Sequence, residues 1–304
     1  MSITELKTPR GTIPFPAYIP VTTFGGKYPL DNLIRPYLPR LASAVMVSYH
    51  YAQQMNQGVN IPIMIDSGGF ASLFDGAKII KQNGLGILEY KTDDDVKRLH
   101  PLEILDFQEK KADIAFTLDF IIPPNMKKRE SIRRMDLTIS NAIWALENCR
   151  RKEMKLYASI QAWDSDSAAD CAKQYASYNF DGVAIGGLVP RAKDEKLIFK
   201  IVNAVRKEIP NKPIHVFGIG KPSLVKQLFD KGVSSVDSSS YVRYAASGKY
   251  FWLKEKVVSE LSPTTILNLA LCNLAQATNA HIPLLFSTCI LKHSKKISVK
   301  DFIS

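Results

Sequence analysis

Short apolar runs rich in isoleucine, valine and alanine recur along the chain and alternate with longer amphipathic or charged segments. The runs are almost continuously apolar, a pattern typical of strands that are covered on both faces. They predict strands at 17–21, 43–48, 61–66, 113–119, 155–161, 182–187, 213–218 and 234–237.

Several of the segments between these runs have apolar residues at helical spacing. A long helix is predicted within 131–151, where the spacing runs through Ile132, Met135, Ile139, Ile143 and Leu146. Further helices are predicted within 166–178, 195–209 and 222–232, the last ended by Gly232. After the final strand, Ser262 is a candidate N-cap, with Pro263 in the first turn of a terminal helix.

The alternation of eight strand candidates with helices predicts an α/β protein with the (β/α)8 TIM-barrel fold. An open, doubly wound sheet is the alternative, because periodicity does not reveal closure. We expect a single domain over 1–304, with a helical and basic tail from about 260. Polar or glycine residues end the predicted strands, and a barrel brings such ends together on one face, where active sites are built. They are Asp66, Asp119, Gln161, Gly186, Gly187, Gly218 and Asp237.

Composition predicts the cellular compartment and the class of binding partner. No apolar run approaches the roughly 18 residues that suggest a membrane span, and the first residues lack a signal-peptide layout. We therefore expect a cytoplasmic protein that does not enter a membrane. The four cysteines form no Cys-x-x-Cys pair, which argues against a disulfide framework and a cysteine-rich zinc site. The 40 Lys and Arg residues exceed the 29 Asp and Glu residues, giving a net charge of +11 that suits a polyanion.

Two aspartates carry the candidate chemistry. Asp237 ends the last strand, where its carboxylate could attack C1′ of a sugar and form a covalent intermediate as a base departs. Asp66 opens the motif Asp-Ser-Gly-Gly-Phe and could move protons to and from the bases. Asp119 and Gln161 offer the acceptors and donors that recognise a purine edge. Each residue alone also fits a cap or a tight turn; together they predict an active site.

The order of the motifs resembles that of tRNA-guanine transglycosylases, from residue 8 to about Arg243. The motifs are Thr-Pro-Arg-Gly with Pro-Ala-x-x-Pro-Val, Ser-Tyr-His, Asp-Ser-Gly-Gly-Phe, Thr-Leu-Asp, Ile-Gln, Phe-Asp-Gly-Val-Ala-Ile-Gly-Gly-Leu, Phe-Gly-Ile-Gly-Lys-Pro, and the Asp-x5-Arg of Asp237 and Arg243. The resemblance implies a barrel that binds guanine and 7-deazaguanines such as preQ0, without a cofactor.

Residue roles follow from the same resemblance. Asp237 matches the covalent nucleophile and Asp66 the general acid/base, whereas Phe70 matches an aromatic residue that stacks on the base. The remaining matches are to the base-recognition groups and the pocket floor: Asp119, Gln161, Gly186, Gly187, the Leu188 backbone, Phe217 and Gly218. Candidate nucleic-acid contacts include Arg243, Lys249, Arg133 and Arg134, for which an ordinary solvated helix face is the alternative.

Departures from the family pattern bear on the substrate. Beyond Asp237, only Cys272, Cys289, His281 and His293 could ligate zinc, and their spacing does not rebuild the family's Cys-x-Cys-x-x-Cys…His site. We therefore expect no zinc subdomain and no bound metal. Val47 stands where the family has an Asn. Ala71 replaces a Gln, and Ala162 and Trp163 replace glycines.

A zinc-less chain of this kind is similar to the DNA-modifying DpdA branch, which implies exchange of guanine in DNA for a preQ0-like base. The alternatives are a zinc-less enzyme acting on tRNA and a non-catalytic nucleic-acid-binding subunit. A base paired in duplex must be unstacked before Asp237 reaches its sugar, which leaves room for a helicase or ATPase partner. The sequence leaves the oligomeric state open.

Overall fold

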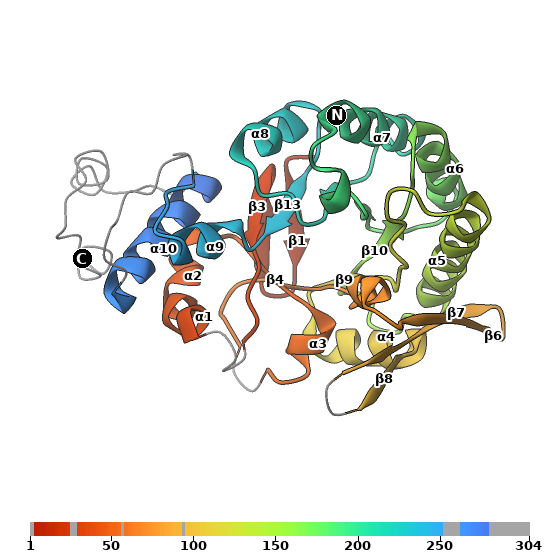
Figure 1. Ribbon diagram of the computed structural model, residues 1–304, viewed down its shortest axis with the longest axis horizontal. Coiled ribbons are helices and arrows are strands. Elements are labelled where there is room, and N and C mark those ends of the chain that lie inside the picture. Colours follow the sequence, from red (N-terminus) through yellow and green to blue (C-terminus); the bar gives the residue numbers. More distant parts are fainter. Residues whose placement is uncertain (1–2, 25–28, 56–57, 93–94, 252–261, 280–304) are drawn as a thin grey trace.

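The computed structural model describes residues 3–24, 29–55, 58–92, 95–251 and 262–279 (Figure 1). Eight parallel strands form one sheet in the order β3-β13-β12-β11-β10-β9-β5-β4. They are β3 (Ala17–Pro20), β4 (Val45–Val47), β5 (Ile63–Ile65), β9 (Ile114–Phe116), β10 (Lys155–Ile160), β11 (Gly182–Ile185), β12 (Ile214–Val216) and β13 (Ser235–Ser238). Each coincides with a run predicted from the sequence.

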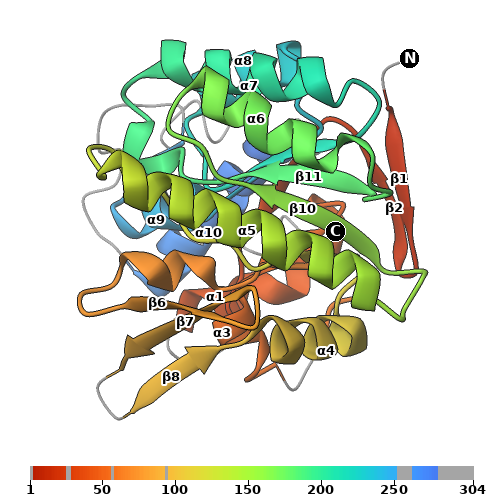
Figure 2. The ribbon, with the colours of Figure 1, turned by 90° about the vertical axis from the view of Figure 1, so that its right-hand side faces the viewer.

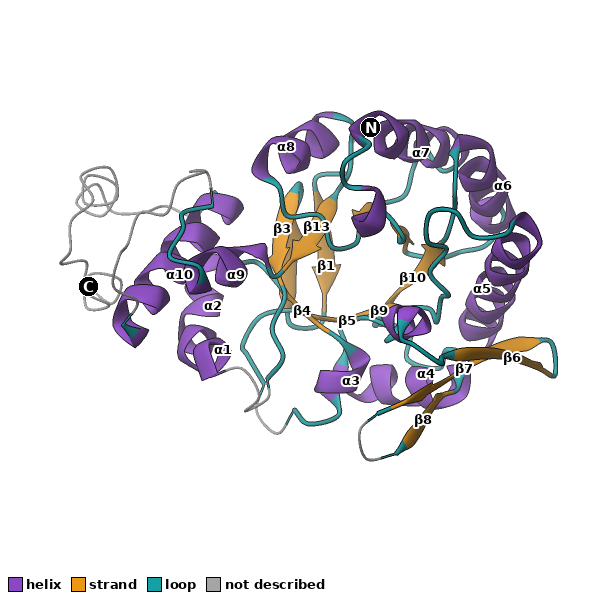
Figure 3. Ribbon diagram, viewed as in Figure 1, coloured by secondary structure: helices purple, strands orange, loops and turns teal. Residues whose placement is uncertain are grey.

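The sheet closes on itself. A parallel bridge joins Val21, just after β3, to Met46 of β4, and the Thr22 N–H donates to the Met46 carbonyl at 2.9 Å. Strand order therefore follows chain order around the ring, which Figure 3 shows surrounded by helices. The prediction of a (β/α)8 barrel is confirmed, and the open sheet is excluded.

Helices of very different lengths cover the barrel. The longer ones are α4 (Pro101–Lys111), α5 (Lys128–Asn148), α6 (Ser165–Ala176), α7 (Glu195–Glu208), α8 (Pro222–Asp230) and α10 (Pro263–Thr278). The shorter ones are α1 (Pro29–Ile34), α2 (Leu38–Leu41), α3 (Tyr49–Ala52) and α9 (Ser240–Ala246), together with the 3-10 turns η1 (Arg35–Tyr37), η2 (Gly69–Leu73) and η3 (Val189–Arg191). The predicted N-cap of α10 is confirmed, because the Ser262 hydroxyl accepts from the Thr265 N–H at 3.1 Å.

The predicted helix at 131–151 exists, but its most apolar face is not its most buried face. Ile132 is 39% exposed. Apart from Leu137, the buried positions are small or polar: Ser131, Thr138, Asn141, Ala142 and Ala145. The polar ones are buried because they hydrogen-bond to loop backbone that periodicity does not describe, as when the Phe120 N–H donates to the Thr138 hydroxyl.

Two antiparallel units extend the barrel (Figure 2). The hairpin of β1 (Glu5–Thr8) and β2 (Gly11–Pro14) covers the amino ends of the strands, where its Ile13 joins the inner core. A three-stranded sheet of β6 (Lys78–Gln82), β7 (Leu85–Lys91) and β8 (Val96–Leu99) lies between η2 and α4 in the chain. Among the described residues, no helix combines the length and the apolar character needed to cross a bilayer.

Candidate active site

A buried carboxylate–amide cluster joins the carboxyl ends of four neighbouring strands, β5, β9, β10 and β11. Asp119, after β9, accepts hydrogen bonds from the Ser67 hydroxyl at 2.8 Å and from Nε2 of Gln161 at 2.5 Å. Two glycines pack so closely on this cluster that no side chain fits. A Cβ on Gly186 would lie 2.1 Å from the Gln161 amide nitrogen, and one on Gly69 would lie 2.2 Å from the Asp119 carbonyl oxygen. We call Ser67, Asp119, Gln161 and Gly186 the Asp119 cluster.

Burial raises the pKa of the carboxyl group in this cluster. Only 7% of Asp119 is exposed, and desolvation raises the pKa of its carboxyl group although the two hydrogen bonds oppose the shift. Gly187 follows with a φ of +70°, a conformation that favours glycine. A carboxylate and an amide at one buried edge present the acceptors and donors that a planar heterocycle with N–H and C=O groups requires.

Asp66 follows β5 and is held by backbone. One carboxylate oxygen accepts from the Tyr49 N–H at 2.8 Å and from the Gly68 N–H at 2.9 Å. Burial raises the pKa of Asp66 to about 6, and the negative charge of Asp237 adds to the rise. A carboxyl group with this pKa exchanges protons readily near neutral pH.

Asp237 lies in β13 with one oxygen tied down and the other available. Oδ1 accepts from the Gly218 N–H at 3.0 Å and hydrogen-bonds to Nε2 of His215 at 3.0 Å. Nδ1 of His215 lies 2.8 Å from the Ser235 hydroxyl, and the imidazole is fully buried. Because a carboxylate accepts, Nε2 of His215 is the donor in the hydrogen bond to Asp237. Among the described residues, Oδ2 of Asp237 has no hydrogen-bond partner, and the side chain remains 10% exposed.

The two carboxylates share one end of the barrel. Strands β4 and β3 lie between β5, which precedes Asp66, and β13, which holds Asp237. Burial is the main cause of the raised pKa of Asp66, and the negative charge of Asp237 makes a small further contribution. Two carboxylates act on one bond only when they face the same space, so the roles predicted for Asp66 and Asp237 depend on this proximity.

The other predicted pocket residues lie around this mouth in different environments. Phe70, in η2, is 57% exposed and meets Phe74 edge to face at 6.2 Å. Phe217 packs its ring 4.9 Å from that of His215 inside the barrel. Gly218 has a φ of +72°, and Leu188 is buried with its carbonyl accepting from the Arg191 N–H at 2.9 Å.

The four predicted nucleic-acid contacts differ in how far their charge is already engaged. Arg133 and Arg134 both pair with Glu130, at 3.0 Å and 3.3 Å. Each also donates at 2.5 Å to a backbone carbonyl, that of Ile79 or Ile121. Arg243, by contrast, is exposed on α9, and Lys249 lies just beyond that helix, half-buried. Arg243 thus presents the most available charge of the four.

Sequence reasoning missed two residues that hold the site. His215 is a buried ring within an apolar strand, and its signal was a polar residue in the run Pro-Ile-His-Val-Phe-Gly. Ser67 was identified only as part of a glycine-rich motif, although its hydroxyl supports Asp119.

The residues considered for zinc lie mostly outside the described ranges. Cys272 is fully buried in α10, whereas Cys289, His281 and His293 fall among residues 280–304. Within the described part of the chain, no group of three or more His, Cys, Asp or Glu side chains is arranged to hold a metal. The departures Val47, Ala71 and Ala162 are all buried.

Comparisons with known proteins identify a matching family model and similar sequences. A family model described as queuine tRNA-ribosyltransferase matches residues 2–278. The chain is 26% identical over 251 residues to a tRNA-guanine(15) transglycosylase of Methanosphaera stadtmanae, covering 81% of this chain and 35% of that protein. It is 25% identical over 275 residues to a queuine tRNA-ribosyltransferase of Thermosipho africanus, covering 82% of this chain and 72% of that protein. The match thus spans about a third of the archaeal relative.

Proposed function

Because the chain belongs to the queuine tRNA-ribosyltransferase family, we propose that it exchanges guanine in a polynucleotide for a 7-deazaguanine through a covalent aspartyl–sugar intermediate. One arrangement carries the proposal: the accessible Oδ2 of Asp237 shares the barrel mouth with Asp66, whose pKa is raised to about 6. The Asp119 cluster lies at the ends of neighbouring strands.

The first step makes the intermediate. Oδ2 of Asp237 bonds to C1′ of the sugar as the C1′–N9 bond breaks, and the electron pair leaves with guanine. The protonated carboxyl of Asp66 gives its proton to the departing base. Hydrogen bonds from His215 and Gly218 hold Oδ1, which fixes the direction of the attacking oxygen.

The second step reverses the roles. N9 of the incoming base bonds to C1′ as the C1′–O bond breaks, and the electron pair returns to the carboxylate of Asp237. The proton on N9 passes to the carboxylate of Asp66, which restores the starting state. A group with a pKa near 6 suits both directions, because neither of its protonation states is strongly disfavoured at neutral pH.

The Asp119 cluster selects the base. Asp119 and Gln161 hydrogen-bond to each other. A guanine edge replaces that contact, because its ring N–H and amino group donate to Asp119 while its carbonyl accepts from Gln161 and the Gly187 N–H. A 7-deazaguanine has the same edge, so both leaving and incoming bases fit one site.

The proposed polynucleotide is DNA, with tRNA as the alternative. The departures at Val47, Ala71 and Trp163, with the absence of a Cys-x-Cys-x-x-Cys motif in the sequence, support DNA and the DpdA branch. The names of the similar proteins support tRNA. The enzyme is offered duplex DNA, single-stranded DNA and tRNA with labelled guanine or preQ0, and label entering only tRNA would overturn the DNA proposal. Label entering only single-stranded DNA would indicate that duplex needs a helicase or ATPase partner.

The covalent step has its own test. The protein is incubated with each polynucleotide, denatured and separated by gel electrophoresis. We expect an adduct with wild type and none with Asp237→Asn, whose amide is a far weaker nucleophile. Retained exchange in Asp237→Asn would exclude the aspartyl intermediate. No adduct and no exchange with any polynucleotide would favour a non-catalytic binding subunit.

A further inference from the structure

Arg191 places a buried positive charge beside the Asp119 cluster. It belongs to η3, which begins directly after the Gly-Gly-Leu segment at the end of β11, and only 6% of it is exposed. Its Nη1 donates at 2.7 Å to the carbonyls of Gly187 and Ile122. Among the described residues, Arg191 forms no ion pair. The charge therefore stands without a carboxylate partner next to the peptide group that follows Gly187.

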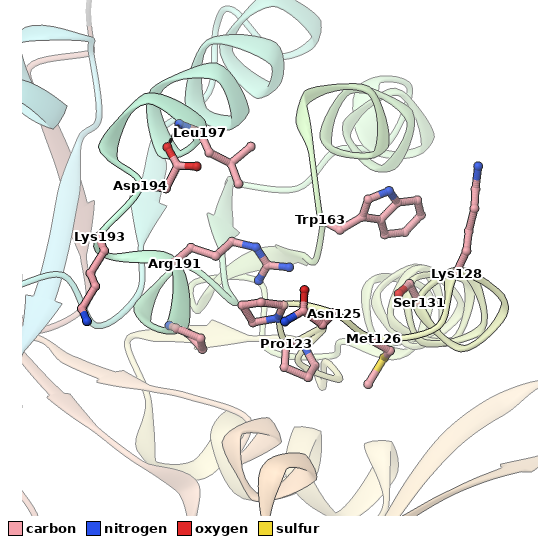
Figure 4. Close-up of a pocket in the computed structure, with 12 residues that line it drawn as sticks. Pro123, Asn125, Met126, Lys128, Ser131, Trp163, Arg191, Lys193, Asp194 and Leu197 are labelled. Atoms are coloured by element: carbon pink, nitrogen blue, oxygen red, sulfur yellow. Dashed lines mark hydrogen bonds between the residues drawn. The ribbon is translucent and has the colours of Figure 1, made fainter.

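A pocket of about 550 Å³ gives this cation its access to solvent. The pocket lies between the connections after β9, β10 and β11, which contribute Pro123, Trp163 and Arg191 to its lining. Figure 4 shows the Arg191 side chain extending toward the middle of the pocket. Its Nε and Nη2 have no hydrogen-bond partner in the described part of the chain and are not among the fully buried polar atoms without a partner. The guanidinium thus has solvent on one side and the Gly187 carbonyl on the other.

Arg191 also engages both backbone carbonyls at the end of β11. Its side chain donates to the Gly187 carbonyl at 2.7 Å, and its own N–H donates to the Leu188 carbonyl at 2.9 Å. In a trans peptide the C=O and N–H groups point in opposite directions, so the Leu188 N–H points away from the guanidinium. Within the described ranges, no group accepts from the N–H of Gly187 or of Leu188. This stretch of backbone therefore offers two donors, while both of its carbonyls are already bonded.

These two donors face one edge of the proposed base. In the proposed exchange, the Gly187 N–H donates to the carbonyl group of guanine or of a 7-deazaguanine. That carbonyl and the substituent on C7 are neighbours on the same edge of the ring system. The next N–H along the chain, that of Leu188, therefore faces the 7-substituent. A donor there favours an acceptor, and the cation behind the peptide repels another cation.

We propose that Arg191 makes the site selective for 7-deazaguanines whose 7-substituent is a hydrogen-bond acceptor, and against those whose substituent is a cation. The nitrogen of a 7-cyano group accepts from the Leu188 N–H. A 7-aminomethyl group is an ammonium at neutral pH, as primary amines are, and it meets a donor and a positive charge instead. Arg191 acts through the backbone, so it is a positioning residue. The inference rests on the proposed function, which places the base at the Asp119 cluster.

The test compares two bases on the polynucleotide that wild type modifies. The measured quantity is kcat/KM for labelled 7-cyano- and 7-aminomethyl-7-deazaguanine, with guanine as the unsubstituted reference. We expect wild type to favour the cyano base by about 10- to 100-fold. Arg191→Met removes the charge and the donors, and it brings the ratio to within about threefold of unity. Arg191→Lys keeps the charge and retains most of the preference.

The ratio distinguishes selectivity from structural damage. A damaged fold lowers kcat/KM for both bases and leaves their ratio unchanged, so an unchanged ratio in Arg191→Met would overturn the role of Arg191. Lys193→Gln removes an exposed charge from the same pocket and is the matched control, with the wild-type ratio expected. If wild type itself uses the aminomethyl base as well as the cyano base, the proposal is wrong whatever the variants do.

Binding of the free bases separates this inference from the proposed function. Calorimetric titration of the protein with each base needs neither a polynucleotide nor turnover. If wild type binds the cyano base more tightly, with the expected dependence on Arg191, but exchanges no base, the proposed function fails and the selectivity stands. If exchange proceeds without a preference between the two bases, the base exchange stands and the selectivity fails.

Discussion

At the scale of single residues, buried polar groups hold the two carboxylates Asp119 and Asp237 in place. Ser235 hydrogen-bonds to His215, His215 to Asp237, and Ser67 to Asp119. A buried polar group without a partner is costly, so each link holds the next in one orientation. In the proposed mechanism, His215 and Ser67 position the two carboxylates without touching the substrate.

The role of His215 leads to a prediction for the nucleophile. His215→Leu removes the donor to Oδ1 of Asp237, and we expect adduct formation to slow by about 10- to 100-fold, because a hydrogen bond to a charged group contributes roughly 1.5–3 kcal/mol. KM for the base stays near wild type. His215→Gln, which can still donate, recovers part of the rate. Single-turnover kinetics measures both, and an equal loss in the two variants would point to general structural damage instead.

The raised pKa of Asp66 predicts how stability depends on pH. Its pKa lies at about 6 in the folded protein, above the ordinary aspartate value of 3.8 that applies to the unfolded chain, so the ionised form destabilises the fold. The favourable contribution is complete below pH 3.8 and is lost as the pH rises through about 6. Asp66→Asn cannot ionise, and we expect its free energy of unfolding relative to wild type to rise by about 1–3 kcal/mol between those pH values. Urea unfolding across this range provides the measurement, and a pH-independent difference would contradict it.

At the scale of elements, the connections after the strands are held by polar residues of the helices. Asn141 of α5 accepts from the Gly86 N–H at 2.9 Å and donates to the carbonyls of Gly86 and Leu118, at 3.1 Å and 3.3 Å. One side chain thereby links the long helix, the outer three-stranded sheet and the segment that leads to Asp119. The predicted helix is thus anchored through a polar residue that its apolar spacing did not single out.

Removing the Asn141 side chain should lower the stability of the fold. Asn141→Leu leaves buried backbone groups of Gly86 and Leu118 without partners, and we expect it to lower the free energy of unfolding by about 2–4 kcal/mol. The matched control is Asn148→Leu on the same helix. Its exposed side chain donates to the Trp144 carbonyl, and the substitution should change stability by less than about 0.5 kcal/mol. Denaturant unfolding compares the two, and equal effects would refute the anchoring role.

At the scale of the whole molecule, closure of the barrel brings scattered strand ends onto one surface, and the net charge of +11 favours a polyanion as the proposed partner. Arg243, exposed on α9, lies six residues after the proposed nucleophile. The last turn of α6, by contrast, points to the amino ends of the strands, because each helix runs back to the start of the next strand. Charges there should contribute little to binding.

This arrangement predicts that the affinity for a polynucleotide falls steeply with salt. Charged residues near the barrel mouth should account for most of the effect. We expect polynucleotide affinity to fall by about 10- to 1,000-fold between 50 and 200 mM salt, through counterion release. Arg243→Gln reduces the slope of log affinity against log salt by about one. Lys173→Gln, in the last turn of α6, is the charge-matched control and leaves the slope unchanged. Fluorescence anisotropy measures the slopes, and equal effects of the two variants would contradict a binding surface at the barrel mouth.

The sequence by itself determined the barrel strands and the residues at their ends, because an unbroken apolar run and a polar residue that ends it are local features. Strands such as 182–187 and helices such as 195–209 could therefore be predicted to within a few residues. Asp66, Asp119, Gln161 and Asp237 could be singled out for the same reason.

Only the tertiary structure decided which of these residues meet. His215 contacts Asp237 across 22 positions and Asn141 contacts Gly86 across 55, and no periodicity encodes such pairs. The short strands β6 and β8 were not predicted because their mixed, largely exposed residues lack a buried face. Local sequence patterns show whether a residue is suited to burial. Its hydrogen-bond partners depend on how the whole barrel folds.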